Sequence, residues 1–255
     1  MRWFFGSGNR VNHILHGTLL LPVLLIMASC GAEADPDREG SAEGPDSLRT
    51  PAEAVEANPE DGPAYMQQAL ADTRGGRYEE AVANLETAVG IGPSADDEYA
   101  LFADAIVEIL TLMRMDYNSG TEIDPTLFDT VEGSLFEALA YLDTAIGLCP
   151  DSAGLYVSRA AVHGFLIEYT PALEDLSTAV ELDPGNCIAL ARRGCVRTEM
   201  GFPEEAVADL TSAIELAPDS ASYYEYRAYA YQMLGEPEKA DADLRTAAEL
   251  GSGTR

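Results

Sequence analysis

The chain has 255 residues, which is enough for one or two domains with a sizeable core. It carries 44 Asp and Glu against 15 Lys and Arg, giving a formal net charge of −29. Such a surface repels phosphate and offers no basic stripe, so the composition argues against a nucleic-acid-binding role. Of the three histidines, only His163 lies outside a segment that we expect to be removed. A site built on several His ligands is therefore excluded, and we expect neither a metal nor a cofactor.

The first 29 residues have the pattern of a secretory signal peptide. A start with Arg2 and Arg10 and no acidic residue precedes twelve uncharged residues that end at Ser29. A membrane span needs about 20 apolar residues, and Pro22 interrupts this shorter run. We therefore expect residues 1–29 to direct export and to be removed.

The residues around Cys30 resemble the lipobox of bacterial lipoproteins. Two small residues, Ala28 and Ser29, precede the cysteine. In that family the signal is cleaved before the cysteine, which is then acylated, and two or three acyl chains hold a protein durably on a bilayer. The resemblance implies lipidation of Cys30 and a place in the bacterial cell envelope, at the outer membrane or the periplasmic face. An ordinary signal peptide or a signal anchor with an incidental cysteine is the alternative.

Residues 30–58 are expected to form the acylated cysteine and a flexible acidic tether. Residues 31–50 contain no aromatic residue and one large aliphatic residue, Leu48, among small residues, prolines and acids. Such a segment cannot bury enough apolar area to offset the entropy of ordering it. Residues 51–59 echo the end of a repeat and suggest a degenerate half repeat.

The sequence beyond the tether is periodic, with a repeat of about 34 residues. Prolines close successive copies at this interval, and small residues recur at it within the copies. The columns are Pro150, Pro184 and Pro218; Ala160, Gly194 and Ala228; and Ala172, Ala206 and Ala240. A closing proline, with turn residues halfway through each copy, predicts two helices per unit, and the small residues allow those helices to approach closely.

This pattern resembles the tetratricopeptide repeat family. Four units run over residues 62–95, 153–186, 187–220 and 221–254, with one further unit between the first two. The resemblance implies an all-α fold over residues 59–255, in which about five helix-turn-helix repeats form a right-handed α-solenoid.

The further unit contains an insertion. Pro93 closes the unit before it and Pro150 closes the unit itself, and these two prolines are much further apart than the closing prolines of other neighbouring units. Residues 107–117 continue an apolar helical pattern, and only residues 118–126 have the composition of a turn. We therefore expect a long helical hairpin that stands above its neighbours.

Comparison of the units also predicts which residues touch. Three units have an arginine at one place and an aspartate sixteen positions later, whereas the first unit has two amides there and the inserted unit two aromatic rings. Because like chemistry recurs at both places, we expect the two to be in contact, although a ladder of anion-binding arginines is an alternative. The pairs are Arg159 and Asp175, Arg193 and Asp209, Arg227 and Asp243, Gln68 and Asn84, and Phe102 and Tyr141.

In the family that the sequence resembles, the first helices of the units line a concave groove that holds a peptide. The resemblance implies an apolar and aromatic groove that accepts an apolar or amphipathic segment of a partner protein. Its candidate residues are Met66, Leu70, Val157, Phe165, Arg192, Tyr226, Tyr229 and Met233. The same stripe could instead pack inside a tight superhelix or beneath the long hairpin.

Three functions remain open from the sequence. We favour a non-enzymatic interaction module without catalytic residues, which is tethered through Cys30 and holds another envelope protein. A cell-envelope hydrolase would need His163 or a pair of carboxylates in a polar cleft. An assembly factor would self-associate through the hairpin, residues 107–127.

Overall fold

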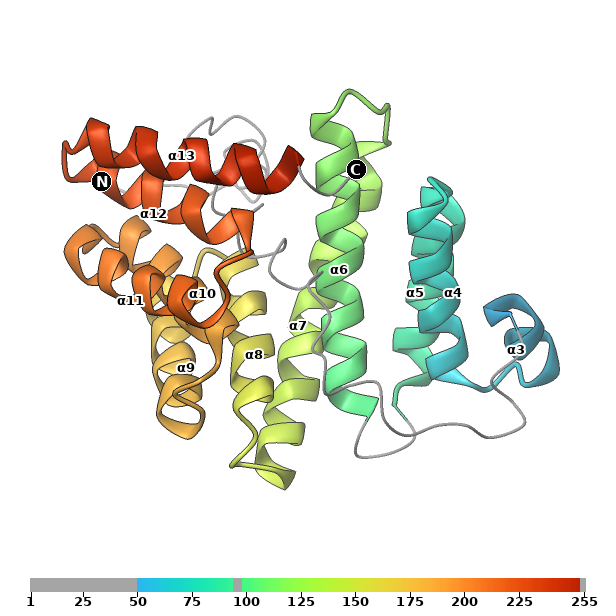
Figure 1. Cartoon of the computed structure of the whole chain (residues 1–255). Coiled ribbons are helices and arrows are strands. Elements are labelled where there is room, and N and C mark those ends of the chain that lie inside the picture. The colour runs from blue at the N-terminus through green and yellow to red at the C-terminus, as the bar shows by residue number, and fades with distance from the viewer. Residues whose placement is uncertain (1–49, 94–97, 253–255) are drawn as a thin grey trace, which may run out of the picture.

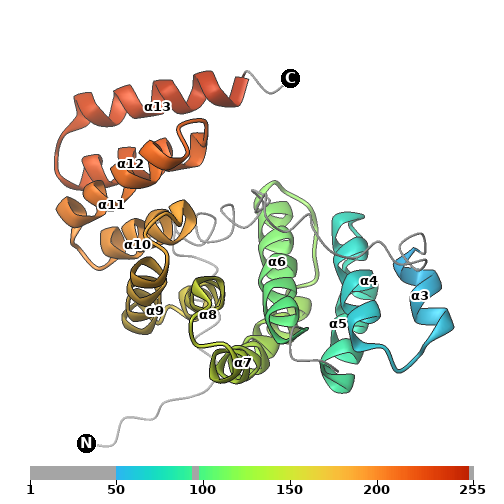
Figure 2. The ribbon, with the colours of Figure 1, turned by 60° about the horizontal axis from the view of Figure 1, so that its bottom comes forward.

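The computed structural model describes residues 50–93 and 98–252, which form eleven helices and no strand. Ten of these helices make five successive pairs (Figure 1). The pairs are α4 (Gly62–Arg74) with α5 (Tyr78–Ile91), α6 (Glu98–Asn118) with α7 (Pro125–Leu148), α8 (Ala153–Phe165) with α9 (Tyr169–Leu182), α10 (Cys187–Glu199) with α11 (Pro203–Leu216), and α12 (Ala221–Met233) with α13 (Pro237–Ser252). Each pair packs on the next to form a solenoid (Figures 1 and 2). The predicted α-solenoid of five helix pairs is confirmed.

The first described helix, α3 (Pro51–Ala57), lies within the residues that the sequence assigned to the tether. The Thr50 hydroxyl accepts a hydrogen bond from the Glu53 backbone, and the Glu53 carboxylate accepts one from the Thr50 backbone. The helix packs against α4, although none of its residues is buried. Helix α3 thus lies where the sequence suggested a degenerate half repeat, before residue 59. The predicted signal peptide, Cys30 and residues 31–49 lie outside the described residues.

Small residues set the distance between the two helices of a unit. Ala160 and Ala228 are 0% and 1% exposed, and Gly194 occupies the same place in the unit between them. A Cβ atom added to Gly194 would lie 2.7 Å from the Cγ atom of Leu210 and 3.1 Å from the carbonyl oxygen of Ala206. The closest approach of α10 and α11 therefore depends on the missing side chain.

The inserted unit is the long hairpin that the sequence predicted. Its helices have 21 and 24 residues, whereas the helices of the other units have 13 to 16. Its far end rises beyond α4 and α5 in Figure 1. Side chains along α6 are fully buried at Ile106, Ile109 and Met113, which explains why the inserted residues keep a helical apolar pattern.

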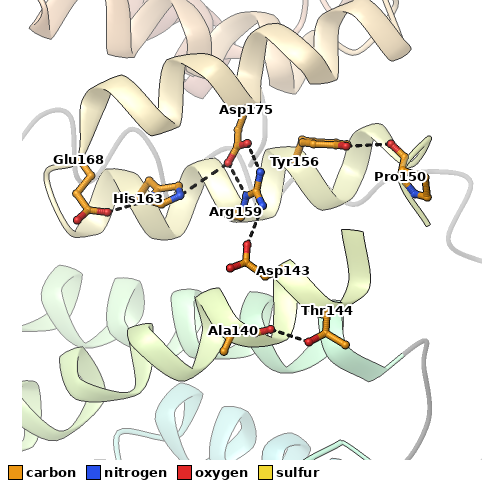
Figure 3. A network of polar contacts seen from close by, with 9 residues as sticks. All are labelled: Ala140, Asp143, Thr144, Pro150, Tyr156, Arg159, His163, Glu168 and Asp175. Carbon is orange, nitrogen blue, oxygen red and sulfur yellow. Dashed lines mark hydrogen bonds and ion pairs between the residues drawn. The ribbon is translucent and has the colours of Figure 1, made fainter. Parts of the chain in front are cut away.

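The paired columns are in contact in the three units that carry charges. The Nε and Nη2 atoms of Arg159 donate to both carboxylate oxygens of Asp175 at 2.9 and 2.6 Å, and the other two arginines bind their aspartates in the same bidentate way. Figure 3 shows Arg159 also reaching back to Asp143 on α7, at 2.7 Å. One guanidinium thus links both helices of its own unit to the unit before. These arginines are occupied, which disfavours an anion-binding ladder.

The other two units use different contacts at the same places. The rings of Phe102 and Tyr141 meet edge to face with centroids 5.7 Å apart. Gln68 and Asn84 instead each donate to the carboxylate of Asp72, both at 2.8 Å. Asp72 is 3% exposed, and a buried carboxylate needs such donors, so the two amides meet through it rather than directly.

Within residues 50–93 and 98–252, no helix combines the length and the apolar character that a membrane span requires.

The contact at Gly194 gives a test of the packing. Gly194→Ala should lower the free energy of unfolding by about 1 to 3 kcal/mol, because the added methyl group meets backbone and Leu210 atoms. Gly133→Ala is the matched control, since nothing lies within 4 Å of its added Cβ, and it should stabilise α7 by about 0.5 to 1 kcal/mol. Urea unfolding of both variants measures the difference; equal effects of the two would contradict the packing described.

Candidate functional site

Most of the predicted groove residues lie inside the solenoid. Five of the eight are at most 9% exposed: Met66, Val157, Phe165, Arg192 and Tyr226. They pack with neighbouring helices and do not form a continuous open surface. Burial at these five places favours the alternative drawn from the sequence, in which the stripe is part of the core.

The long hairpin covers the first part of the stripe. Met66 and Phe165 share one core cluster with the buried side chains of α6. The guanidinium of Arg114, on α6, lies 5.5 Å from the centre of the Phe165 ring and is held by an ion pair with Glu132 at 2.6 Å. The inserted helix therefore fills the space that a groove would need at this place.

Arg192 lies in the middle of the stripe as a buried cation. Its side chain is 5% exposed, and its Nη1 atom donates to the carbonyl oxygen of Val157 at 3.2 Å. Among the described residues its Nε atom has no hydrogen-bond partner. Arg192 thus joins α10 to α8 rather than facing solvent.

Three predicted groove residues keep exposed surface or are only partly buried. Leu70 lies on α4 and packs at the edge of the first core cluster. Tyr229 and Met233 lie together near the other end of the solenoid, four residues apart on α12 and so on one side of it. Tyr229 is half-buried, and Met233 is 54% exposed. The structure therefore brings only this pair together on an accessible face.

An acidic residue adjoins this pair. The Tyr229 hydroxyl interacts with the carboxylate of Glu199, at the end of α10. Tyr169, at the start of α9, interacts electrostatically with both residues. The three side chains come from three successive units and are all half-buried. We call Tyr169, Glu199, Tyr229 and Met233 the C-terminal site.

Burial dominates the electrostatics of the C-terminal site. It raises the pKa of Glu199, and the interaction with the Tyr229 hydroxyl only partly opposes that rise. Burial, followed by the charge of Glu199, raises the pKa of Tyr169 to about 12. The Oε1 atom of Glu199 is enclosed and, among the described residues, has no hydrogen-bond partner. The site therefore holds a partly buried carboxyl group near two phenol rings.

Glu199 and Tyr169 are absent from the groove predicted from sequence. The signal for Glu199 was present, because it lies one repeat after Phe165 and one repeat before Met233, and both of those were chosen. The predicted groove consists of apolar and aromatic residues with Arg192, and it therefore omits the acidic residue between Phe165 and Met233. Tyr169 lies on a second helix, so a search restricted to first helices could not find it.

His163 belongs to the scaffold around Arg159. Its Nδ1 atom lies 2.8 Å from Glu168, and its Nε2 atom lies 3.9 Å from Asp175, the partner of Arg159 (Figure 3). These contacts connect the two ends of the turn between α8 and α9. In the described part of the chain, no group of three or more His, Cys, Asp or Glu side chains is placed to hold a metal ion.

Solved structures share the fold. A crystal structure of the protein MamA is 18% identical over 75% of this chain and 92% of that chain, with a TM-score of 0.50. MamA from Desulfovibrio magneticus RS-1, solved from residue 41 to its end, is 16% identical over 76% and 96%, with a TM-score of 0.50. YrrB, described as a TPR protein with an unusual peptide-binding site, is 21% identical over 79% and 92%, with a TM-score of 0.44.

At these identities the similarity shows a common fold alone. It agrees with the helix pairs that recur along the sequence, and the described chain is a solenoid of the tetratricopeptide type. A scan against protein-family models and a search of curated proteins each returned no match.

The raised pKa of Glu199 predicts how stability depends on pH. The folded chain binds this proton more tightly than the unfolded chain, whose carboxyl pKa is near 4.5. The stabilising effect is therefore fully present below pH 4.5 and is lost as the pH rises through the folded value. Glu199→Gln, which stays neutral, should be up to about 1 kcal/mol more stable than wild type at pH 7, because the group is only half-buried.

The two proteins should have equal stability at about pH 3.5, where both side chains are neutral. Urea unfolding at both pH values measures the difference. Glu215→Gln, at an exposed position of α11, controls for the loss of one negative charge. If the stability gain of Glu199→Gln depends on pH no more than that of the control, the raised pKa of Glu199 is refuted.

Proposed function

We propose that this chain is a non-enzymatic interaction module that binds an extended or helical segment of another protein at the C-terminal site. Solenoids of helix pairs offer long surfaces for such segments. The observation that carries the proposal is the exposed face of α12 at Tyr229 and Met233, beside a carboxyl group without a complete set of partners. Elsewhere the predicted groove is filled by the core and the long hairpin.

We also propose that the module is held at a bacterial membrane through an acylated Cys30. The signal-like residues 1–29 and the small residues before Cys30 support this assignment. The tether of residues 31–50 would let the solenoid reach a partner away from the bilayer. The periplasmic face or the outer membrane is the place that this arrangement favours.

Self-association through the long hairpin is a second candidate. Three large apolar side chains of this unit are exposed: Met115 at 41%, Tyr117 at 40% and Phe136 at 64%. Deletion of residues 107–127 would then convert an oligomer into a monomer in sedimentation. A hydrolase has weaker support, because the His163 ring lies against Glu168 and Asp175 at the turn between α8 and α9.

Crosslinking in cells that produce the full chain, followed by capture from membranes, tests the proposed function. Met233→Asp should lower recovery of the bound protein about tenfold or more, because it places a charge on the docking face. Leu216→Asp is the matched control, since Leu216 is 50% exposed and also ends its helix. Equal recovery with Met233→Asp and wild type would refute docking on α12.

The same experiment also tests the proposed lipid anchor at Cys30. Cys30→Ser should move the chain from the membrane to the soluble fraction, because no acyl chain is attached. A variant that stays in the membrane fraction would refute the lipid anchor without bearing on the docking site.

A further inference from the structure

The first two units show how this solenoid satisfies an acidic residue at the place of Glu199. The equivalent residues there are Arg74 and Glu108, one repeat apart. The Nε atom of Arg74 donates to Glu108 Oε1 at 3.1 Å, and its Nη2 atom forms an ion pair with the same oxygen. A guanidinium from the neighbouring unit therefore pairs with the carboxylate.

No described base is recorded in contact with Glu199. The equivalent residue of the preceding unit is Phe165, which is buried, and that of the following unit is Met233, which is exposed. At this position of the repeat, the C-terminal units therefore have the acidic residue, Glu199, but no basic residue one repeat before or after it.

The other basic residues of this region are already engaged. Between residues 150 and 252, each Lys, Arg or His contacts another acceptor. The contacts are Arg159 with Asp175, His163 with Glu168, Arg192 with the Val157 carbonyl, Arg193 and Arg197 with Asp209, Arg227 with Asp243, Lys239 with Glu236, and Arg245 with the Asp241 carbonyl. None of these recorded contacts joins a base to Glu199, although the Nε atom of Arg192, seven residues earlier on α10, also has no hydrogen-bond partner among the described residues.

The surroundings of Glu199 suit a cation. Tyr169 and Tyr229 lie close enough to interact electrostatically with its carboxylate. The face of a phenol ring attracts an ammonium or guanidinium group that lies within about 6 Å. The Tyr229 hydroxyl can offer this carboxylate one donor, whereas a guanidinium can donate two hydrogen bonds to one carboxylate. A partner's cation can therefore displace this hydroxyl with a gain in pairing.

We propose that Glu199, with Tyr169 and Tyr229 beside it, is the receptor for a lysine or arginine side chain of the protein segment that docks on α12. The inference rests on the proposed function and adds the chemistry of the partner: an apolar side chain against Met233 next to a basic one at Glu199. The net charge of −29 favours the approach of such a basic segment.

A neutral and a charged probe of the same shape test this receptor. We would add N-acetyl-arginine amide, or N-acetyl-citrulline amide, to the full chain with labelled tyrosine rings and follow the ring signals by NMR. The arginine probe should shift the signals of Tyr169 and Tyr229 in a saturable way and bind about tenfold more tightly than the citrulline probe. Equal binding of the two probes would overturn the proposal.

Two variants distinguish a cation-binding role of Glu199 from a purely structural role. Glu199→Gln should lower affinity for the arginine probe about tenfold while raising stability at pH 7. Tyr229→Phe keeps the ring and removes the competing hydroxyl, so it should bind the probe at least as tightly as wild type. Unchanged binding by Glu199→Gln, or loss of binding by Tyr229→Phe, would contradict the assignment.

The failure of this inference can be told from the failure of the proposed function. In one outcome, Met233→Asp abolishes capture of a membrane protein, Glu199→Gln does not, and the arginine probe fails to bind. This outcome would support docking on α12 and refute the cation receptor. If the arginine probe binds through Glu199 but Met233→Asp leaves capture unchanged, the cation receptor is supported and docking on α12 is refuted.

Discussion

Bidentate ion pairs between the two helices of a unit hold this solenoid in register. The carboxylates of Asp175, Asp209 and Asp243 are 5%, 5% and 6% exposed, and each accepts two hydrogen bonds from the arginine sixteen positions earlier. A buried carboxylate is stable only with such partners, so the pair allows one arrangement of the helices. Arg159 and Arg227 also bind the preceding unit, at Asp143 and Thr211. Equivalent residues of successive units consequently become neighbours, as Arg74 and Glu108 are.

This arrangement makes the two ends of the molecule different. Toward the N-terminal end, the long hairpin brings α6 over Met66 and Phe165, and the acid at the shared place has its arginine. Toward the C-terminal end the units are of ordinary length, and Glu199 lies near Tyr169 and Tyr229 with one oxygen that has no hydrogen-bond partner among the described residues. A carboxyl group that weakens the free fold and gains a partner on binding is a common feature of functional sites. The insertion in one unit covers the stripe near that unit, and the candidate site therefore lies in the C-terminal units.

Much of the fold could be predicted because each unit repeats the same structure. The contact of Arg193 with Asp209 followed from comparison of units, and so did the edge-to-face contact of Phe102 with Tyr141. The depth of burial could not be predicted, because it depends on how the hairpin and the successive units curve around the first helices. Phe165 and Met233 occupy equivalent places, yet one is 4% exposed and the other 54%. Asp72 was missed as the acceptor between Gln68 and Asn84 because the other units have no acid that would have indicated it.

A double-mutant cycle on Met233→Arg and Glu199→Gln, measured by urea unfolding at pH 7, tests most directly whether neighbouring units leave Glu199 without its cation. An arginine at position 233 would lie one repeat from Glu199, the same separation as that between the paired Arg74 and Glu108. The account predicts that Met233→Arg stabilises the wild-type chain but not the Glu199→Gln background, with a coupling energy of about 0.5 to 1 kcal/mol. A coupling energy of zero would contradict it, because the two residues would then not be neighbours or Glu199 would already be neutralised.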